Sequence, residues 1–390
     1  MIVGRWGEAG RRRARDAGLL ACVWLACAAG ATKATAGGDA APIPAAGEHA
    51  QGAPAQTSPA LVRLGRALFF DPRLSVDGST SCATCHDPAH YFSDGRAVSR
   101  GVGGRTGFRN APSLLEVSAV TTPFWDGRVD SLEAQAAAPL VNPREMAMPN
   151  RDAVAAAVRQ ADGYRPLFTA AFGTTSADAI DIPRITGALA AYERTLRAGN
   201  SRFDREAFGG ETGLLSASEE RGRRLFTGMA GCTGCHVIGP TAAPLSDDRF
   251  HSLAVGLQPI ADRLAALTLQ VAAWRREGRT PDQIVQAGPD YAALGRFVVT
   301  LRPADLGAFR TPSLRNVAMT APYMHDGSVA TLREAVDDEV YYRSSERGRP
   351  LLLTPRERGD LVAFLGSLST PLDDVLAQAP TARPRAAAAN

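Results

Sequence analysis

Apolar residues recur along this chain at the spacing that places them on one face of a helix. The first such stretch begins at Ser58-Pro59, a typical helix start, and continues with leucines at positions 61, 64 and 68. Further helices are expected in residues 132–138 after Ser131, 153–161 after Asn150, 182–196, and 361–368 after the capping box Thr354-Pro355-Arg356-Glu357. Residues 257–295 form a further helical insertion. No run alternates convincingly between apolar and polar residues, so the predicted fold class is all-α with long loops.

A short run is repeated in the two halves of the chain. Gly65-Arg66-Ala67-Leu68-Phe69 precedes Cys82-Ala83-Thr84-Cys85-His86, and Gly222-Arg223-Arg224-Leu225-Phe226 precedes Cys232-Thr233-Gly234-Cys235-His236. In each half a helix therefore leads into a Cys-x-x-Cys-His loop. This spacing is typical of c-type haem attachment, in which both thiols bond to the porphyrin and the histidine ligates the iron. The repeat predicts two cytochrome-c-like helical domains.

A pair of zinc sites is the alternative for these cysteines. Structural zinc takes four ligands at one site, whereas the two cysteine pairs are 150 residues apart. Two copies of the motif in a chain with six cysteines therefore favour a di-haem protein.

The N-terminus has the pattern of an export signal. Arginines between residues 5 and 15 precede an apolar stretch, 17–31, that is short for a mature membrane helix, and Ala34-Thr35-Ala36 fits a cleavage site. Without residues 1–36 the charges of the chain nearly cancel, and nothing indicates nucleic-acid binding. We expect a periplasmic protein, because no spare thiol then remains. Lipoprotein cleavage at Cys22 or Cys27 is the alternative.

The expected organisation has five parts. They are a signal peptide (1–36), a disordered linker (37–57), an N-terminal cytochrome-c-like domain (58–205), a C-terminal cytochrome-c-like domain (206–376) and a disordered tail (377–390).

Several ordered runs between Leu64 and Leu368 resemble the bacterial di-haem cytochrome c peroxidases and their methylamine-utilisation (MauG) relatives. The runs are Leu68-Phe69-Phe70-Asp71-Pro72-Arg73-Leu74-Ser75, Arg109-Asn110-Ala111-Pro112-Ser113-Leu114, Phe124-Trp125-Asp126-Gly127-Arg128, Phe309-Arg310-Thr311-Pro312-Ser313-Leu314-Arg315-Asn316 and Pro322-Tyr323-Met324-His325-Asp326-Gly327. The resemblance implies a first haem, ligated by His86, that reacts with peroxide, and a second haem that relays electrons.

The resemblance also implies roles for individual residues. Glu145 falls at the position of the distal acid/base, where a carboxylate can carry the proton that peroxide loses and regains. Gln135 falls at a second distal polar position, and Trp125 at that of a tryptophan between the haems. Without the resemblance, Glu145 would be a solvated loop carboxylate and Trp125 an ordinary core aromatic.

A calcium ion and a second histidine are implied as well. Asn110, Thr320 and Pro322 match a calcium site, with backbone carbonyls from the last two. His325 matches a position at the edge of the second haem, with a hydrogen-bonding or relay role. By contrast, His90 is expected to be a structural loop histidine. His251 is expected to be structural as well, and a position near the second haem is its alternative.

Two departures from the family pattern concern the iron ligands. Where typical peroxidases place a histidine that plugs the first haem at rest, this chain has Val102, so we expect that haem to be open. Typical members supply a methionine to the second haem, but no methionine follows Met324. The ungapped equivalent is Glu339, and Tyr341 or Tyr342 is preferred because MauG-type proteins use tyrosine there. An open site, or tyrosines that pack only structurally, are the alternatives.

The expected function is a periplasmic di-haem oxidoreductase that reduces hydrogen peroxide with electrons from a small cytochrome c or cupredoxin. A MauG-type oxidation of a partner protein is the first alternative, and a non-catalytic di-haem electron carrier is the second. Two covalent c-type haems and one calcium ion are the expected cofactors. The oligomeric state stays open, with a homodimer among the options.

Overall fold

The structure is a computed structural model that describes residues 58–346, 348 and 350–378. The expected signal peptide, the linker and residues 379–390 of the expected tail lie outside the described residues. The α-helices are α1 (Pro59–Phe69), α2 (Cys82–Cys85), α3 (Leu132–Val141), α4 (Arg151–Gln160), α5 (Tyr164–Phe172), α6 (Ile182–Glu193), α7 (Arg202–Ala207), α8 (Ala217–Thr227), α9 (Leu264–Arg276), α10 (Pro281–Val285), α11 (Pro289–Ala293), α12 (Phe297–Thr300), α13 (Leu332–Glu346), α14 (Pro355–Ser367) and α15 (Leu372–Gln378).

Nine short 3₁₀ turns and two strands complete the described part of the chain. The 3₁₀ turns are η1 (Pro72–Leu74), η2 (Pro88–His90), η3 (Val102–Gly104), η4 (Val117–Ala119), η5 (Ala177–Ala179), η6 (Cys232–Gly234), η7 (Gln258–Ile260), η8 (Pro303–Asp305) and η9 (Val317–Met319). β1 (Phe250–Ser252) and β2 (Ala308–Arg310) pair antiparallel, with His251 opposite Phe309. The all-α prediction missed this ribbon, because three-residue strands are too short to show an alternating pattern. The fold is mostly helical. In the described ranges, no helix combines the length and apolarity that a membrane span requires.

The predicted helix starts are confirmed by their caps. The Ser58 hydroxyl accepts a hydrogen bond from Leu61 N at 3.1 Å at the start of α1. At the start of α14, Thr354 and Glu357 exchange the two bonds of a capping box. Ser131 and Asn150 cap α3 and α4 as expected. Each cap satisfies backbone N–H groups that the first helical turn leaves without a partner.

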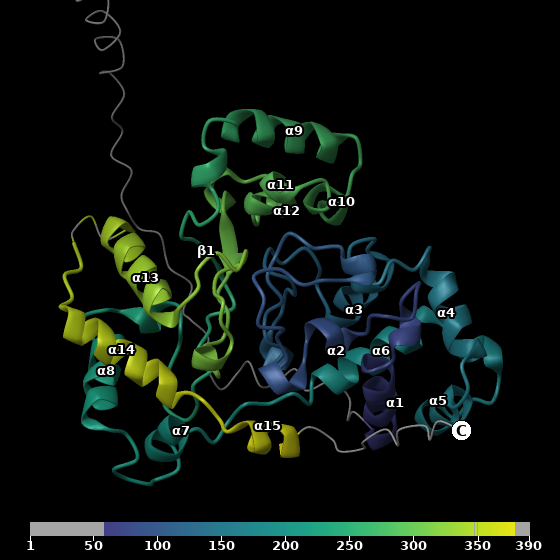
Figure 1. The fold of residues 1–390 in the computed structure, drawn as a ribbon, viewed down its shortest axis with the longest axis horizontal. Helices are drawn as coiled ribbons and strands as arrows, with labels where there is room; N and C mark the ends of the chain where they lie inside the picture. Colours follow the sequence, from purple (N-terminus) through teal and green to yellow (C-terminus); the bar gives the residue numbers. More distant parts are fainter. Residues whose placement is uncertain (1–57, 347, 349, 379–390) are drawn as a thin grey trace, which may run out of the picture. The chain divides into compact units, whose positions relative to one another are not determined.

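The repeated sequence run forms two helix crossings that are built alike. α1 packs against α6, and α8 packs against α14 (Figure 1). A Cβ added to Gly65 on α1 would lie 1.8 Å from Ala188 O, and one added to Gly222 on α8 would lie 1.9 Å from Asp360 O. Glycine therefore allows the backbones to approach at both crossings, and the crossings align α6 with α14 residue by residue.

The buried apolar residues form three clusters. The first contains α1, α4, α5 and α6, and the second contains α8, α13 and α14. Phe203 of α7 belongs to the second cluster, and the predicted boundary between residues 205 and 206 falls inside that helix. A third cluster is formed by α9 to α12, so the predicted helical insertion has a core of its own.

Candidate functional site

The histidines of the two Cys-x-x-Cys-His motifs are held in the same way. His86 Nδ1 lies 3.1 Å from Phe92 O, and His236 Nδ1 lies 2.9 Å from Leu245 O. A carbonyl that holds one ring nitrogen fixes the tautomer and orientation of a ligating imidazole. Nε2 is therefore the nitrogen with which each ring would ligate iron. Burial is the largest cause that lowers the pKa of His86, which favours the neutral, ligating form.

The surroundings of the first motif fit a large group with polar edges. The four described cysteines form no disulfide, so their thiols remain for covalent attachment. Close to Cys85 lies Asp94, whose Oδ2 atom is buried without a hydrogen-bond partner. Buried polar atoms without partners are rare and mark a missing group or water. The residues present therefore fit a haem at this motif.

Glu145 is a half-buried residue beside the first motif. It lies in the turn that follows α3, and its Oε1 accepts a hydrogen bond from Asn142 Nδ2 at 2.7 Å. Burial raises the pKa of Glu145 to about 7, against the opposing effect of Arg128. Burial also raises the pKa of the Cys82 and Cys85 thiols, and the Glu145 charge adds to both shifts. The carboxyl group is therefore within electrostatic range of the haem-attachment thiols, and its raised pKa differs from that of a fully solvated carboxylate.

Val102 lies directly against the backbone of Glu145. Val102 N donates to Glu145 O at 2.9 Å, and the valine side chain is buried. An added Cβ on Gly101 would lie 2.4 Å from the same carbonyl, so this loop has to pass close to the turn. Gln135, the second predicted distal residue, is half-buried on α3. The tertiary fold therefore gathers around the Glu145 turn several residues that are distant in sequence.

Trp125 joins the 109–128 region to the loop that carries His325. Its Nε1 donates to Asn110 O at 2.9 Å, and its carbonyl accepts from Arg310 N at 2.8 Å. Asn110 N donates to His325 O at 2.9 Å. His325 is buried and stacks on Phe309 with ring centroids 3.6 Å apart, and its burial lowers its pKa to about 4. Trp125 thus contacts segments of both halves of the chain.

A buried ion-pair network lies next to Trp125. Asp126 accepts hydrogen bonds from Arg109 NH1 at 2.7 Å and from Arg128 NH1 at 3.1 Å. Burial alone would raise the pKa of Asp126, but the two guanidinium groups outweigh it and lower the pKa to about 2. Arg128 also donates to Asp282 of α10 at 3.0 Å. The insertion therefore contributes a charge to the network that acts on Glu145.

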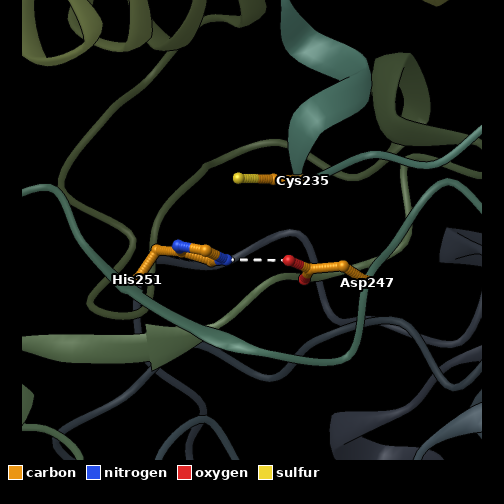
Figure 2. A group of neighbouring side chains, drawn as sticks. All are labelled: Cys235, Asp247 and His251. Atoms are coloured by element: carbon orange, nitrogen blue, oxygen red, sulfur yellow. Dashed lines mark hydrogen bonds and ion pairs between the residues drawn. The ribbon is translucent and has the colours of Figure 1, made fainter. Parts of the chain in front are cut away.

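The second motif has a charged pair that the sequence analysis did not predict. Figure 2 shows His251 of β1 and Asp247 pointing toward each other beside Cys235, with His251 Nε2 2.8 Å from Asp247 Oδ2. The hydrogen bond to Asp247 is the largest cause that raises the pKa of His251 to about 10. The three ligand atoms lie within 4.8 Å of one another. Because Cys235 belongs to the haem-attachment motif, this group lines the second haem site and is not an independent ion site. The signal that could have found it is Ser-Asp at 93–94 and again at 246–247.

The predicted ligands of the second haem and of calcium are less closely gathered. Tyr341 is 71% exposed, whereas Tyr342 is half-buried and its ring lies 5.3 Å from that of Tyr341. Thr320 and Pro322 lie in the loop that follows η9, and the bond from Asn110 to His325 brings Asn110 to this loop. The iron and calcium ligand assignments stay predictions. His90, whose ring is 56% exposed and contacts Asp87, has the surroundings of a loop histidine.

Comparisons with known proteins agree with this arrangement. The sequence model of the di-haem cytochrome c peroxidase family matches residues 59–212. The chain is 40% identical to the methylamine utilization protein MauG of Methylorubrum extorquens over 80% of this chain and 78% of that protein. It is 37% identical to the cytochrome-c peroxidase IdrP1 of Denitromonas iodatirespirans over 89% of this chain and 90% of that protein.

A solved structure shares the fold as well. The diheme peroxidase BthA of Burkholderia thailandensis superposes with a TM-score of 0.64 and 26% identity, over 81% of this chain and 87% of that chain. The two relatives above are similar to the chain over most of both lengths, and the first haem motif lies within the residues that the family model matches. The chain therefore belongs to the di-haem cytochrome c peroxidase and MauG family, and it is a peroxidase-like di-haem oxidoreductase.

Proposed function

We propose that this protein is a periplasmic enzyme that reduces hydrogen peroxide with electrons from a small redox protein. The observation that carries the proposal is Glu145, a half-buried carboxyl group whose pKa is raised to about 7 beside the thiols of the first motif. Such a group is what a reaction with proton transfer requires, because a general acid/base works best when its pKa is near the working pH.

Two haem domains carry this proposal. Cys82, Cys85 and His86 would hold the first haem in residues 58–205, and Cys232, Cys235 and His236 would hold the second in residues 206–376. When bound, the haems supply the redox chemistry, which is peroxide reduction at the first and electron storage at the second. A calcium ion held by Asn110, Thr320 and Pro322 would tie the two halves together. His325 would contact the edge of the second haem.

The proton transfer would be carried by Glu145. Asn142 donates to Oε1, so Oε2 is the atom that accepts a proton from peroxide and returns it to the departing oxygen. Because Asn142 and Arg128 oppose the effect of burial, the pKa of Glu145 stays near neutrality. Both protonation states are then populated at neutral pH, which two-way proton transfer needs. Gln135 would orient peroxide by hydrogen bonding.

Trp125 would connect the two haem sites. Its indole Nε1 donates to Asn110 O, and its main-chain carbonyl accepts from Arg310 N. Segments of both halves of the chain therefore hold this residue. An aromatic ring between two redox centres shortens the distance of each electron-transfer step. Next to Trp125, the buried Asp126 forms an ion pair with Arg109.

A MauG-type oxidation of a partner protein is the second candidate. Val102 favours it, because a valine at this buried position cannot plug the first haem as a histidine would. The two tyrosines at 341 and 342 in place of a methionine also favour it, since an anionic ligand stabilises ferric iron. The relatives include proteins of both names, MauG and cytochrome-c peroxidase.

Turnover separates the two candidates. The holoprotein would be mixed with peroxide and a reduced cytochrome c or cupredoxin, and donor oxidation followed by absorbance. Rapid, stoichiometric oxidation supports the peroxidase. A slow reaction with a long-lived oxidised species supports partner-protein oxidation. If the ferric protein does not react with stoichiometric peroxide at all, both candidates are wrong and the electron carrier is correct.

A further inference from the structure

A second carboxyl group lies near the first motif, and the proposed proton transfer does not use it. Glu193 is the last residue of α6 and is only 4% exposed. Its Oε2 atom is buried without a hydrogen-bond partner. A buried carboxyl group without a partner destabilises the fold unless it binds a proton. Such a group therefore needs an explanation beyond packing.

The nearest cation does not neutralise Glu193. Arg194 is committed to Glu133 of α3, with bonds of 2.7 and 2.9 Å from its two terminal nitrogens to the two carboxylate oxygens. Burial raises the pKa of Glu193 to about 8, Arg194 opposes this shift, and Glu133 adds to it. Arg66 of α1 acts on the neighbouring Tyr192. Among the described residues, Arg194 and Glu133 thus act on the Glu193 carboxyl group, Arg66 acts on Tyr192, and Glu193 in turn acts on the Cys82 thiol.

The internal repeat shows that the fold itself does not require this carboxyl group. An added Cβ on Gly65 meets Ala188 and Tyr192 of α6, and one on Gly222 meets Asp360 and Phe364 of α14. This alignment places Glu193 opposite the position of Leu365 in the second half. Leu365 is 6% exposed and belongs to the second apolar cluster. One half therefore buries a carboxyl group where the other half buries an ordinary core leucine.

The place of Glu193 connects it with the first haem site. After burial, the negative charge of Glu193 is the largest cause that raises the pKa of the Cys82 thiol, and Cys85 and Glu145 contribute less. Cys82 itself packs against the first apolar cluster, to which α6 contributes Tyr192 and Leu189. Glu193 thus lies within electrostatic range of Cys82, one of the two thiols that would attach the first haem. Charges in an apolar interior are only weakly screened, so the charge of Glu193 acts strongly on neighbouring groups.

We propose that Glu193 is a proton-binding site coupled to reduction of the first haem. When a small redox protein gives one electron to that haem, one proton from water binds the Glu193 carboxylate, so the negative charge added to the buried site is offset. No other bond forms or breaks. The inference rests on the proposed attachment of the first haem at Cys82, but it does not depend on peroxide chemistry.

Redox titration of the holoprotein tests the proposal. The reduction potential of each haem would be measured against an electrode, by absorbance, at a series of pH values around 8. In the unmodified protein the reduction potential of one haem, the first, should fall as pH rises. The slope should reach up to about 59 mV per pH unit, which is a tenfold change in the equilibrium constant of a one-electron reduction. The reduction potential of the second haem serves as the internal control.

Two variants separate proton binding from a structural role. Glu193→Gln keeps the shape and cannot titrate, so the slope for the first haem should disappear. Glu193→Leu copies the residue of the second half and should fold at least as well as the unmodified protein, again without the slope. Redox-difference infrared spectra with isotope-labelled glutamate should show the C=O band of a protonated carboxyl group only in the unmodified protein.

Two results would overturn the proposal. One is an unchanged slope in both variants. The other is loss of the slope in Glu145→Gln but not in the Glu193 variants, since the proton would then bind Glu145. Peroxide consumption, measured on the same unmodified sample, tests the proposed function separately.

Discussion

Replacement of Glu145 by glutamine is the most direct test of the proposed acid/base. The substitution keeps the size of the side chain and leaves an oxygen that can accept the bond from Asn142 Nδ2, which is 2.7 Å long in the structure. It removes only the ability to bind and release a proton. We expect haem content and folding to be retained and the reaction with peroxide to slow.

The size of the effect follows from the surroundings of the carboxyl group. A positioned general acid/base contributes roughly 10²- to 10⁴-fold, or about 3–5 kcal/mol of barrier. Because burial raises the pKa of Glu145 to about 7, the carboxylate that accepts the proton is lost as pH falls through 7. The rate in the unmodified protein should therefore rise with pH and level off above that value. Asn142→Ala removes a donor that stabilises the carboxylate, so the midpoint should move to higher pH.

Stopped-flow absorbance of the ferric holoprotein with stoichiometric peroxide gives the rate, and haem content gives the control for assembly. Glu133→Gln makes the same charge change at a half-exposed position of α3, and it should leave the rate unchanged. A Glu145→Gln protein that reacts at the normal rate and keeps the pH dependence near 7 would refute the acid/base assignment. A lost pH dependence in Glu133→Gln would refute it as well.

Three further substitutions, and a fourth that serves as a control, test the site and the fold. Val102→His should supply the first haem with an additional ligand, which gives a low-spin ferric spectrum and a slower peroxide reaction; an unchanged spectrum would contradict the placement of Val102. Gly65→Ala should lower the free energy of unfolding, measured with denaturant, by about 1–3 kcal/mol, because its Cβ would lie 1.8 Å from a carbonyl oxygen of α6. Gly187→Ala is the control: it has open space around it and should raise that free energy by about 0.5–1 kcal/mol. Equal effects of the two substitutions would argue against the close crossing of α1 and α6. Asp126→Asn should destabilise by about 3–5 kcal/mol, because it leaves two buried arginines without their carboxylate. The two arginines lower the pKa of Asp126 to about 2, so the stability that this carboxylate contributes at neutral pH should be lost only as pH falls from about 4 toward 2. If the Asp126→Asn protein loses as much stability over that pH range as the unmodified protein, the assignment of the loss to Asp126 is wrong.

Much of the architecture could be predicted because its signals are local. Ser58, Ser131 and Thr354 cap helices as the sequence predicts, since a cap and the residues that it bonds are three positions apart or fewer. The haem motifs are equally local, and the structure adds only the carbonyls that hold His86 and His236. The ribbon of β1 and β2 was missed because each strand has three residues and its partner is more than fifty positions away.

The sequence by itself determined the two haem-attachment motifs, the repeated helix pair and the family. Only the tertiary structure decided which carboxyl groups are buried. The family resemblance marks the position of Glu145, but nothing in the sequence marks Glu193 or shows that either pKa is raised. Both shifts are caused mainly by burial, to which segments distant along the chain contribute. The same holds for the contact between Val102 and Glu145 and for the pair of Asp247 and His251. Desolvation depends on what surrounds a group in three dimensions, and a linear pattern does not contain that information.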